Sequence, residues 1–451
     1  MCSESLRSRN MGGVRRNLIL LLVLLGASSA CTGGGGSSTS LDPIGAPSST
    51  SLAPTEAPSA SGVPTPSVSS VSSTRISLEP SGTGSFLVHA VYPKTQSRCK
   101  HAHTARFRAR YPGALSVKSA DDGTLSLVAT LPFERYLEGI AEVPPTWPAA
   151  ALQAQVIAAR SYALSHIDWS GKQGAAVQEP ICATTECQVY GGIHVPPTPG
   201  IDRWYRAVRD TEGQVLMFDG RPADTVYYST SNGHTYGNDQ VFGSAPLPYL
   251  RPVIERDDGA SPMSHWQVTI PFGQLATFLS AGGVWPDGAR ISSARSVGSN
   301  VVVTGGSHSA SIDAGTFRDA VNTWAPCLMP GRYPTSVLPT TIPSGWSEVG
   351  SGQSGATVTG RGWGHGVGMV QWGAYGKAKR GWSADRILAY YYGGLAPQTY
   401  PEPGLIHVIV ATGLASLAVE APTAGATING QPFAGGTVRL SGNAGTVTAA
   451  P

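Results

Sequence analysis

The stretch Glu142-Val-Pro-Pro-Thr-Trp-Pro148, followed by Ala-Ala-Ala-Leu-Gln-Ala-Gln-Val-Ile-Ala-Ala-Arg-Ser-Tyr-Ala-Leu (149–164), decides the organisation of this chain. Apolar residues at helical spacing over 133–142 predict a short helix that ends at the glutamate. The two central prolines end this helix, and the third proline suits the first turn of the next one. The sequence therefore predicts a carboxylate beside a proline turn, followed by an alanine-rich helix.

Strand-like patterns surround this helix on both sides. Alternating apolar residues and Gly or Asp turns predict strands at 85–92, 104–111, 123–131, 213–220 and 224–231. Residues 266–326 predict strands near 266–270 and 300–304 and helices near 272–280 and 314–324. We expect an α+β fold, with a mixed, β-rich catalytic domain over 83–400 and the alanine-rich helix at its centre. Residues 401–451 read as a small β-rich C-terminal segment, or as a truncated module.

The N-terminal region reads as an export signal and a tether. Basic residues, the apolar run 18–25 and small residues before Cys31 form a signal that is too short to span a bilayer. The small residues before Cys31 resemble a bacterial lipoprotein signal over residues 1–31, with Cys31 lipidated; a soluble secreted protein cleaved near Ala30 is the alternative. Residues 32–82 are rich in Gly, Ser, Pro and Thr and predict a disordered tether.

The charge balance gives no argument for nucleic acid. The formal net charge is +3, from 31 basic and 28 acidic residues. Four of the basic residues and one acidic residue lie in the first 31 positions, which leaves 27 of each sign in the rest. We therefore expect no nucleic-acid partner.

The cysteines favour disulfides over a metal site. Apart from Cys2 and the Cys31 of the signal, the chain has Cys99, Cys182, Cys187 and Cys327. Three pairings are open, of which we favour Cys182–Cys187 with Cys99–Cys327. Histidines follow Cys99 closely, but four-ligand metal spacing is missing, so Cys182 and Cys187 are only weak metal candidates and no cofactor is expected.

Arg160 falls on the apolar stripe of the alanine-rich helix, at helical spacing from Leu152 and Val156. A guanidinium that faces a core needs an anion. Glu142 is one candidate, an anionic or hydroxyl-rich ligand is a second, and a purely structural arginine–glutamate pair is the third. Apolar neighbours raise the pKa of a carboxyl such as Glu142 and make it a useful general acid, whereas contact with Arg160 lowers it.

Two other glutamates, Glu134 and Glu138, share the helical spacing of Glu142. We expect both at a solvated edge of the short helix, without a part in catalysis.

The glycine-dense stretch 360–376 does not have the spacing of a dinucleotide or phosphate loop. Its glycines allow the backbone to approach a ligand closely, and Trp363, His365 and Gln371 are suited to sugars. A polar segment at 229–236 reads by itself as a turn after a strand.

The motif around Glu142 and Arg160, the Ser-Thr-Ser-Asn-Gly-His-Thr segment and the Gly-Trp-Gly-His-Gly-Val-Gly-Met-Val-Gln-Trp-Gly-Ala segment occur in the order seen in one family. Over about residues 85–400 the chain resembles the stage II sporulation protein D family, which includes amidase-enhancer proteins. The resemblance implies a peptidoglycan lytic transglycosylase with Glu142 as catalytic acid and base and Arg160 as its support. The candidate substrate-binding residues are Ser161, Ser229, Ser231, Asn232, His234, Thr235, Trp363, His365 and Gln371.

Two departures from the family pattern carry consequences. Val143 stands where the family has methionine, and Glu186 precedes Cys187 where some members have a metal-binding histidine. The second departure favours a disulfide over zinc.

The expected partners are peptidoglycan glycan strands, a cell-wall amidase, and a membrane reached through the lipid anchor. The expected location is the outer face of the cytoplasmic membrane, or the cell wall after secretion. A non-catalytic, wall-binding enhancer of an amidase and a structural scaffold of the envelope are the alternatives to an enzyme.

Overall fold

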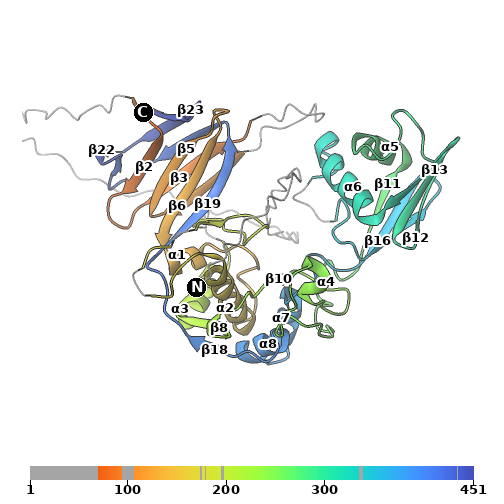
Figure 1. Cartoon of the computed structure of the whole chain (residues 1–451), viewed down its shortest axis with the longest axis horizontal. Coiled ribbons are helices and arrows are strands. Elements are labelled where there is room, and N and C mark those ends of the chain that lie inside the picture. The colour runs from red at the N-terminus through yellow and green to blue at the C-terminus, as the bar shows by residue number, and fades with distance from the viewer. Residues whose placement is uncertain are drawn as a thin grey trace, which may run out of the picture.

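The computed structural model describes residues 70–93, 106–172, 175–177, 179–193, 198–334, 339–433 and 435–450. These residues form a β sandwich, a mainly helical body below it and a separate α/β module (Figure 1). The mixture of helices and strands agrees with the expected α+β class. The expected signal peptide with Cys31, most of the tether, and Cys99 lie outside the described residues.

The sandwich consists of two sheets. The first has the order β1 (Val71–Ser73), β24 (Thr446–Ala450), β23 (Thr437–Asn443), β20 (Ser416–Glu420), β3 (Ser85–Val91) and β4 (Arg106–Pro112). The second has the order β22 (Gln431–Phe433), β21 (Ala426–Ile428), β2 (Arg75–Pro80), β5 (Ala114–Ser119), β6 (Leu125–Pro132), β19 (Leu405–Leu414) and β7 (Ile181–Cys182). Alternate side chains of both sheets point inward and share one core, with Val88, Leu127 and Leu440 fully buried.

The ends of the chain contribute to both sheets, which differs from the expected domain boundaries. Residues 71–80, placed in the tether by their composition, form β1 and β2, and Ile76 and Leu78 are buried in the core. Residues 405–450 form no separate appendage, because β20 pairs with β3 and β21 pairs with β2. These segments are short, and their pairing partners lie far away in the sequence.

The helical body continues directly from the sandwich. Strand β6 runs into α1 (Phe133–Glu138), and the alanine-rich helix α2 (Ala149–His166) lies at the centre of the body. Around it lie α3 (Ile201–Asp210), β8 (Gln214–Phe218), β9 (Arg221–Pro222), β10 (Tyr227–Tyr228), α4 (Asn238–Phe242), β17 (Met369–Val370), α7 (Gln371–Lys379), α8 (Ala384–Tyr391) and β18 (Pro397–Thr399). Nearly all of α2 is buried, because its alanines let neighbouring elements approach on every side.

The α/β module is inserted between the 229–258 region and the glycine-dense stretch. It contains β11 (Trp266–Pro271), α5 (Phe272–Ala281), β12 (Ser293–Val297), β13 (Asn300–Gly305), β14 (His308–Asp313), α6 (Ala314–Leu328), β15 (Ser347–Ser351) and β16 (Gly355–Gly360). The module has its own hydrophobic core, which includes Ile270, Phe278 and Val358. The expected strands and helices within 266–326 correspond to β11, β13, α5 and α6.

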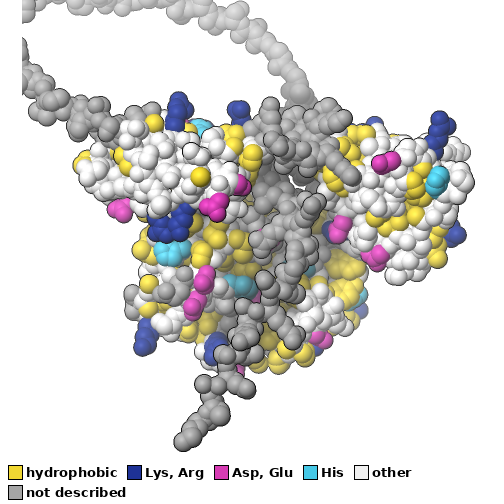
Figure 2. Space-filling model, turned by 45° about the horizontal axis from the view of Figure 1, so that its top comes forward, with side chains coloured by type: hydrophobic (Ala, Val, Ile, Leu, Met, Phe, Trp, Pro, Cys, Tyr) yellow, Lys and Arg dark blue, Asp and Glu magenta, His cyan; other side chains and the backbone are white. Residues whose placement is uncertain are grey.

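The surface carries scattered charge. Figure 2 shows most Lys and Arg side chains apart from one another on the visible face, with one gathering of them at the left of the view. Within the described part of the chain, none of the helices combines the length and the hydrophobicity needed to cross a membrane.

Candidate functional site

Glu142 lies where two distant segments meet. Residues 139–142, which follow α1, run beside residues 189–191, and Ala141 donates its backbone N–H to the carbonyl of Val189 at 2.9 Å. Val189 in turn donates its N–H to Oε1 of Glu142 at 2.7 Å. The second segment follows β7, which pairs with β19 at the end of the sandwich sheet. The sandwich thus positions both segments that form the site.

The surroundings of Glu142 favour its protonated form. Burial among protein atoms raises the pKa of the carboxyl to about 7, and hydrogen bonds from Val189 and from the Gln371 side chain lower it by less. The phenols of Tyr136, Tyr162 and Tyr227 surround this carboxyl, and its charge adds to the effect of burial in raising their pKa values. A carboxyl with a pKa near 7 can both donate and accept a proton at neutral pH.

The buried side chain of Gln188 fixes the segment that carries Val189. Gln188 donates from Nε2 to the Tyr136 hydroxyl at 3.0 Å and accepts at Oε1 from the Tyr227 hydroxyl at 2.7 Å. A disulfide between Cys182 and Cys187 closes the loop directly before Gln188. The loop that carries Val189 is therefore anchored by a covalent bond at one end and by two phenols at the other.

Gln371, expected to bind substrate, is placed next to Glu142. It is the first residue of α7, is only 6% exposed, and its Nε2 donates to Oε1 of Gln155 at 3.4 Å. Gln155 lies on α2, is 1% exposed, and its Nε2 has no hydrogen-bond partner among the described residues. The two amides form a buried polar pair beside the Glu142 carboxyl, and Nε2 of Gln155 is the donor of this pair that lacks a partner in the described part of the chain.

Sequence reasoning missed Gln155, Gln188, Tyr136 and Tyr227. A polar residue in an otherwise alanine-rich, buried helix was the one available signal for Gln155. The other three belong to segments with ordinary patterns, so only the fold reveals them.

Arg160 does not support Glu142, which corrects the role that the resemblance implied. Its guanidinium is fully buried and donates to both carboxylate oxygens of Glu134 at 3.0 Å. It also lies 2.8 Å from a carboxylate oxygen of Glu402. Among the described residues, no ion pair joins Arg160 to Glu142. Of the three alternatives for the anion that Arg160 needs, the structure favours a structural arginine–glutamate pair, and the glutamate is Glu134.

Glu134 differs from the solvated edge residue that was expected. Its side chain is 27% exposed and takes part in the buried pair with Arg160. Burial raises its pKa to about 8, Arg160 opposes that rise, and the nearby Glu402 adds to it. Glu138 pairs with Arg135 on the outer side of the same helix.

Several candidate hydroxyls are engaged in holding the fold. Ser161 accepts the backbone N–H of Leu216, Ser231 binds Asp258, and Thr235 accepts the N–H of Val253. All three candidate residues are buried. Ser229, Asn232 and His234 are partly exposed, and Oδ1 of Asn232 has no partner in the described part of the chain. Of the candidate substrate-binding residues in the 229–236 segment, these three are the ones that a ligand can reach.

His365 stabilises the glycine-dense loop. Its Nδ1 accepts the backbone N–H of Val367 at 3.1 Å, so Nε2 carries the proton and donates to the carbonyl of Tyr227 at 2.9 Å. Burial lowers its pKa to about 4, so the ring is neutral at pH 7. Both ring nitrogens are already engaged, and the partly exposed Trp363 lies on the same loop, tied by backbone bonds to Thr230.

Metal-binding groups are not gathered at the site. The described residues include no group of three or more His, Cys, Asp or Glu side chains that could hold a metal ion. The sulfurs of Cys182 and Cys187 are bonded to each other. Cys327 is also disulfide-bonded, and Cys99, its expected partner, lies outside the described residues.

Comparison with known proteins supports one family. The family model described as Stage II sporulation protein matches residues 121–218, which include α1, Glu142 and α2. An uncharacterized protein of Brachyspira hyodysenteriae is 30% identical over 292 residues, which cover 63% of this chain and 71% of that protein. Stage II sporulation protein D of Bacillus subtilis is 29% identical over 279 residues, which cover 59% of this chain and 74% of that protein. The amidase enhancer of Bacillus subtilis is 31% identical over 296 residues, which cover 57% of this chain and only 39% of the enhancer.

Proposed function

Because the chain belongs to the stage II sporulation protein D family, we propose that it is a lytic transglycosylase that cleaves peptidoglycan glycan strands. The observation that carries the proposal is the placement of Glu142. Burial raises the pKa of its carboxyl to about 7, and hydrogen bonds from Val189 and Gln371 orient it.

One carboxyl is sufficient for this reaction, because no water molecule has to be activated. Protonated Glu142 donates its proton to the glycosidic oxygen that follows N-acetylmuramic acid, and the bond from C1 to that oxygen breaks. The resulting carboxylate then accepts the proton of the C6 hydroxyl while O6 of the same sugar bonds to C1. The products are a 1,6-anhydro end and a free hydroxyl, and Glu142 is protonated again. Ordinary glycosidases use two carboxylates instead.

We propose that the protein acts outside the cytoplasmic membrane. The sequence of residues 1–31 supports export, and Cys31 supports attachment to the membrane through lipid. The Gly, Ser, Pro and Thr content of residues 32–69 supports a tether between that anchor and β1.

The test uses the chain from residue 32 and purified glycan strands, with 1,6-anhydro-muramyl products detected by mass spectrometry. We expect release by the wild type and a loss of about 10²–10⁴-fold in the Glu142→Gln variant. Glu186→Gln, an exposed glutamate on the neighbouring loop, serves as the matched control and retains activity. Undiminished release by Glu142→Gln would contradict the mechanism.

A non-catalytic enhancer of a cell-wall amidase is the second candidate, supported by the similarity to the amidase enhancer of Bacillus subtilis. It predicts that the wild type binds strands without cleaving them and stimulates an added amidase. Glu142→Gln would then stimulate the amidase as well as the wild type does.

A further inference from the structure

The outer face of the six-stranded sandwich sheet is basic. Val88 on β3 and Leu440 on β23 are buried in the sandwich core, so the residues on either side of them along each strand face outward. The outward basic residues of this sheet are Arg106, Arg108 and Arg110 on β4, His89 on β3 and Arg439 on β23.

The strand register places these side chains on one surface. Arg108 is paired with His89, His89 with Ala418, and Ala418 with Arg439, so the four residues form one row across the sheet. Side chains of directly paired residues point to the same face. Arg108 and Arg439 are three strands apart, which separates their backbones by roughly 14 Å. The charges therefore cover most of the width of the sheet.

Little on this face opposes the positive charge. Glu420 is the one acidic residue at the outward positions of the six strands, and its carboxylate lies 2.7 Å from Nε2 of His89. Arg106, Arg108 and Arg439 are exposed, and within the described residues none of the three has an ion pair or a side-chain hydrogen bond. Beyond residue 31 the chain has equal numbers of basic and acidic residues, so this face is a local excess of positive charge.

The shape of the face suits an extended partner. Its other outward positions carry mainly short side chains, among them Thr437, Ser441, Thr448 and Ser72. A small ligand needs a concave site with converging groups, whereas guanidiniums that project from a broad face can contact a charged surface together. Exposed arginines without partners suit phosphate groups in particular.

The same sheet is connected to the N-terminal segment. Strand β1, the first described element, is an edge strand of this sheet and pairs with β24. Under the proposed attachment at Cys31, the chain from the membrane enters the fold at this sheet. Attachment also raises the effective concentration of the membrane surface around the folded part, so that a weak electrostatic contact becomes occupied.

We propose that this face docks on the outer surface of the cytoplasmic membrane by binding anionic phospholipid headgroups. Arg106, Arg108 and Arg439 bind headgroup phosphates, and Arg110, which also donates to Ser85, supports them. The inference rests on the location given under the proposed function, and it does not depend on which bond is cleaved.

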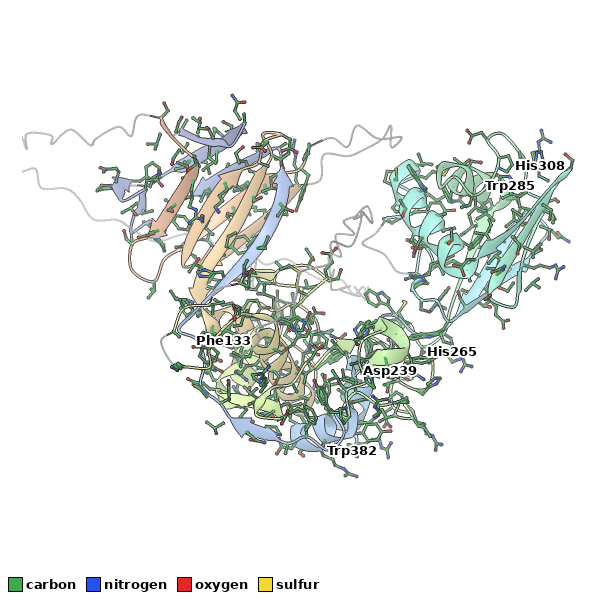
Figure 3. All side chains as sticks on the ribbon, in the orientation of Figure 1. Phe133, Asp239, His265, Trp285, His308 and Trp382 are labelled. Carbon is green, nitrogen blue, oxygen red and sulfur yellow. A yellow bond between two sulfur atoms is a disulfide. The ribbon has the colours of Figure 1, made fainter. Side chains whose placement is uncertain are left out.

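Docking through the sandwich leaves the Glu142 site free. Figure 3 shows Phe133, the residue at which β6 passes into α1, between the sandwich and the helical body. Glu142 follows α1 on the side of the body. A docked sandwich therefore holds the molecule at the membrane without covering this carboxyl.

The test measures cosedimentation with vesicles, using the chain from residue 32, which keeps every described residue and carries no lipid. One set of vesicles contains equal parts of phosphatidylcholine and phosphatidylglycerol, and the other contains phosphatidylcholine alone. We expect binding to the first set only, and weaker binding at high salt, because exposed charges are screened. Each guanidinium contributes about fivefold to affinity for an anionic surface, so the Arg106→Gln/Arg108→Gln/Arg439→Gln variant should bind about a hundredfold more weakly.

A second triple variant is the matched control. Arg256, Arg290 and Arg295 are exposed and lie outside the sandwich, and their replacement by glutamine removes the same charge. This variant should bind the phosphatidylglycerol vesicles as the wild type does. Thermal unfolding checks both triple variants, and the three single variants of the basic face, each with about a fivefold loss, provide a second measurement.

The outcomes separate this inference from the proposed function. Equal losses in the two triple variants overturn the docking assignment, because they reflect net charge alone. Wild-type binding that does not require phosphatidylglycerol overturns it too, as does binding to a soluble polyglycerol phosphate without binding to vesicles. The variant of the basic face should cleave glycan strands in solution at the wild-type rate. If the wild type cleaves no strands but the arginine-dependent vesicle binding is found, docking stands and the transglycosylase proposal fails.

Discussion

Val189 donates its backbone N–H to Oε1 of Glu142 at 2.7 Å, across a separation of 47 residues in the sequence. This bond ties the proposed catalytic acid to the segment that directly follows the loop closed by the Cys182–Cys187 disulfide. The orientation of the carboxyl therefore depends on the integrity of that loop.

Removal of this disulfide is expected to reduce catalysis more than binding. A Cys182→Ser/Cys187→Ser variant should lose about ten- to a hundredfold in kcat, because a misplaced acid is a poor proton donor, while KM changes little. A disulfide that closes a loop this short contributes about 2 kcal/mol to the free energy of unfolding, so the variant should still fold. Steady-state kinetics on glycan strands, with thermal unfolding as the folding control, provides the measurement. A kcat equal to that of the wild type would show that the loop does not position Glu142.

Substitution of Gln371 by leucine is expected to shift the pH profile. The Gln371 side chain hydrogen-bonds the carboxyl and lowers its pKa, so its loss should move the pKa above the present value of about 7. The alkaline limb of the kcat profile should move to higher pH, with a lower maximum. The Gln155→Leu variant loses the hydrogen bond between Gln155 and Gln371 but keeps the one between Gln371 and Glu142. It should therefore shift the alkaline limb of the kcat profile less. A change in KM alone, with an unmoved limb, would assign Gln371 to substrate binding instead.

The raised pKa of Glu142 predicts a pH-dependent stability difference. The folded pKa is about 7 against an ordinary value of 4.5, so the folded protein holds the extra proton between these pH values. The contribution of Glu142 to stability therefore decreases as pH rises through this window, by up to about 3 kcal/mol. The Glu142→Gln side chain cannot ionise. The free energy of unfolding of this variant, relative to that of the wild type, should therefore be higher at pH 8 than at pH 5.

Urea unfolding of the wild type and Glu142→Gln at pH 5 and pH 8 measures this difference directly. Comparing two proteins at each pH cancels the contribution of other groups such as Glu134. The exposed Glu186→Gln variant is the control. A stability difference that is equal at both pH values would show that the carboxyl is not desolvated in the folded protein.

Arg160 is expected to act on stability. Arg160→Met leaves Glu134 and Glu402 without their buried partner, and should lower the free energy of unfolding by about 3–5 kcal/mol. The stability difference that Glu142→Gln produces between pH 5 and pH 8 should persist in this background. An increase of this difference in the Arg160→Met background would show that Arg160 lowers the pKa of Glu142, and would restore the role implied by the family resemblance. Chemical denaturation of the single and double variants gives both results.

Local patterns predicted the centre of the molecule well. Pro148 precedes the observed α2 (Ala149–His166), which follows the expected alanine-rich run. The first helix is shorter than expected, because α1 ends at Glu138 with Gly139 as its cap, before Glu142 and the two prolines. These features depend on φ restriction and apolar periodicity, which act within a few residues and are visible in the sequence. The same patterns misplaced residues 71–80, because their strands are stabilised by partners at the other end of the chain.

By itself, the sequence determined that a lone carboxyl stands beside a proline turn and that a buried arginine on α2 needs an anion. It could not decide which anion, because Glu142 and a ligand satisfied the same electrostatic requirement, and Glu134 was expected at a solvated edge. Only the tertiary structure decided this, by bringing Glu402 and Glu134 to Arg160 and leaving Glu142 to Val189 and Gln371. The physical reason is that the pKa of a buried acid depends on neighbours that the fold brings from distant parts of the chain.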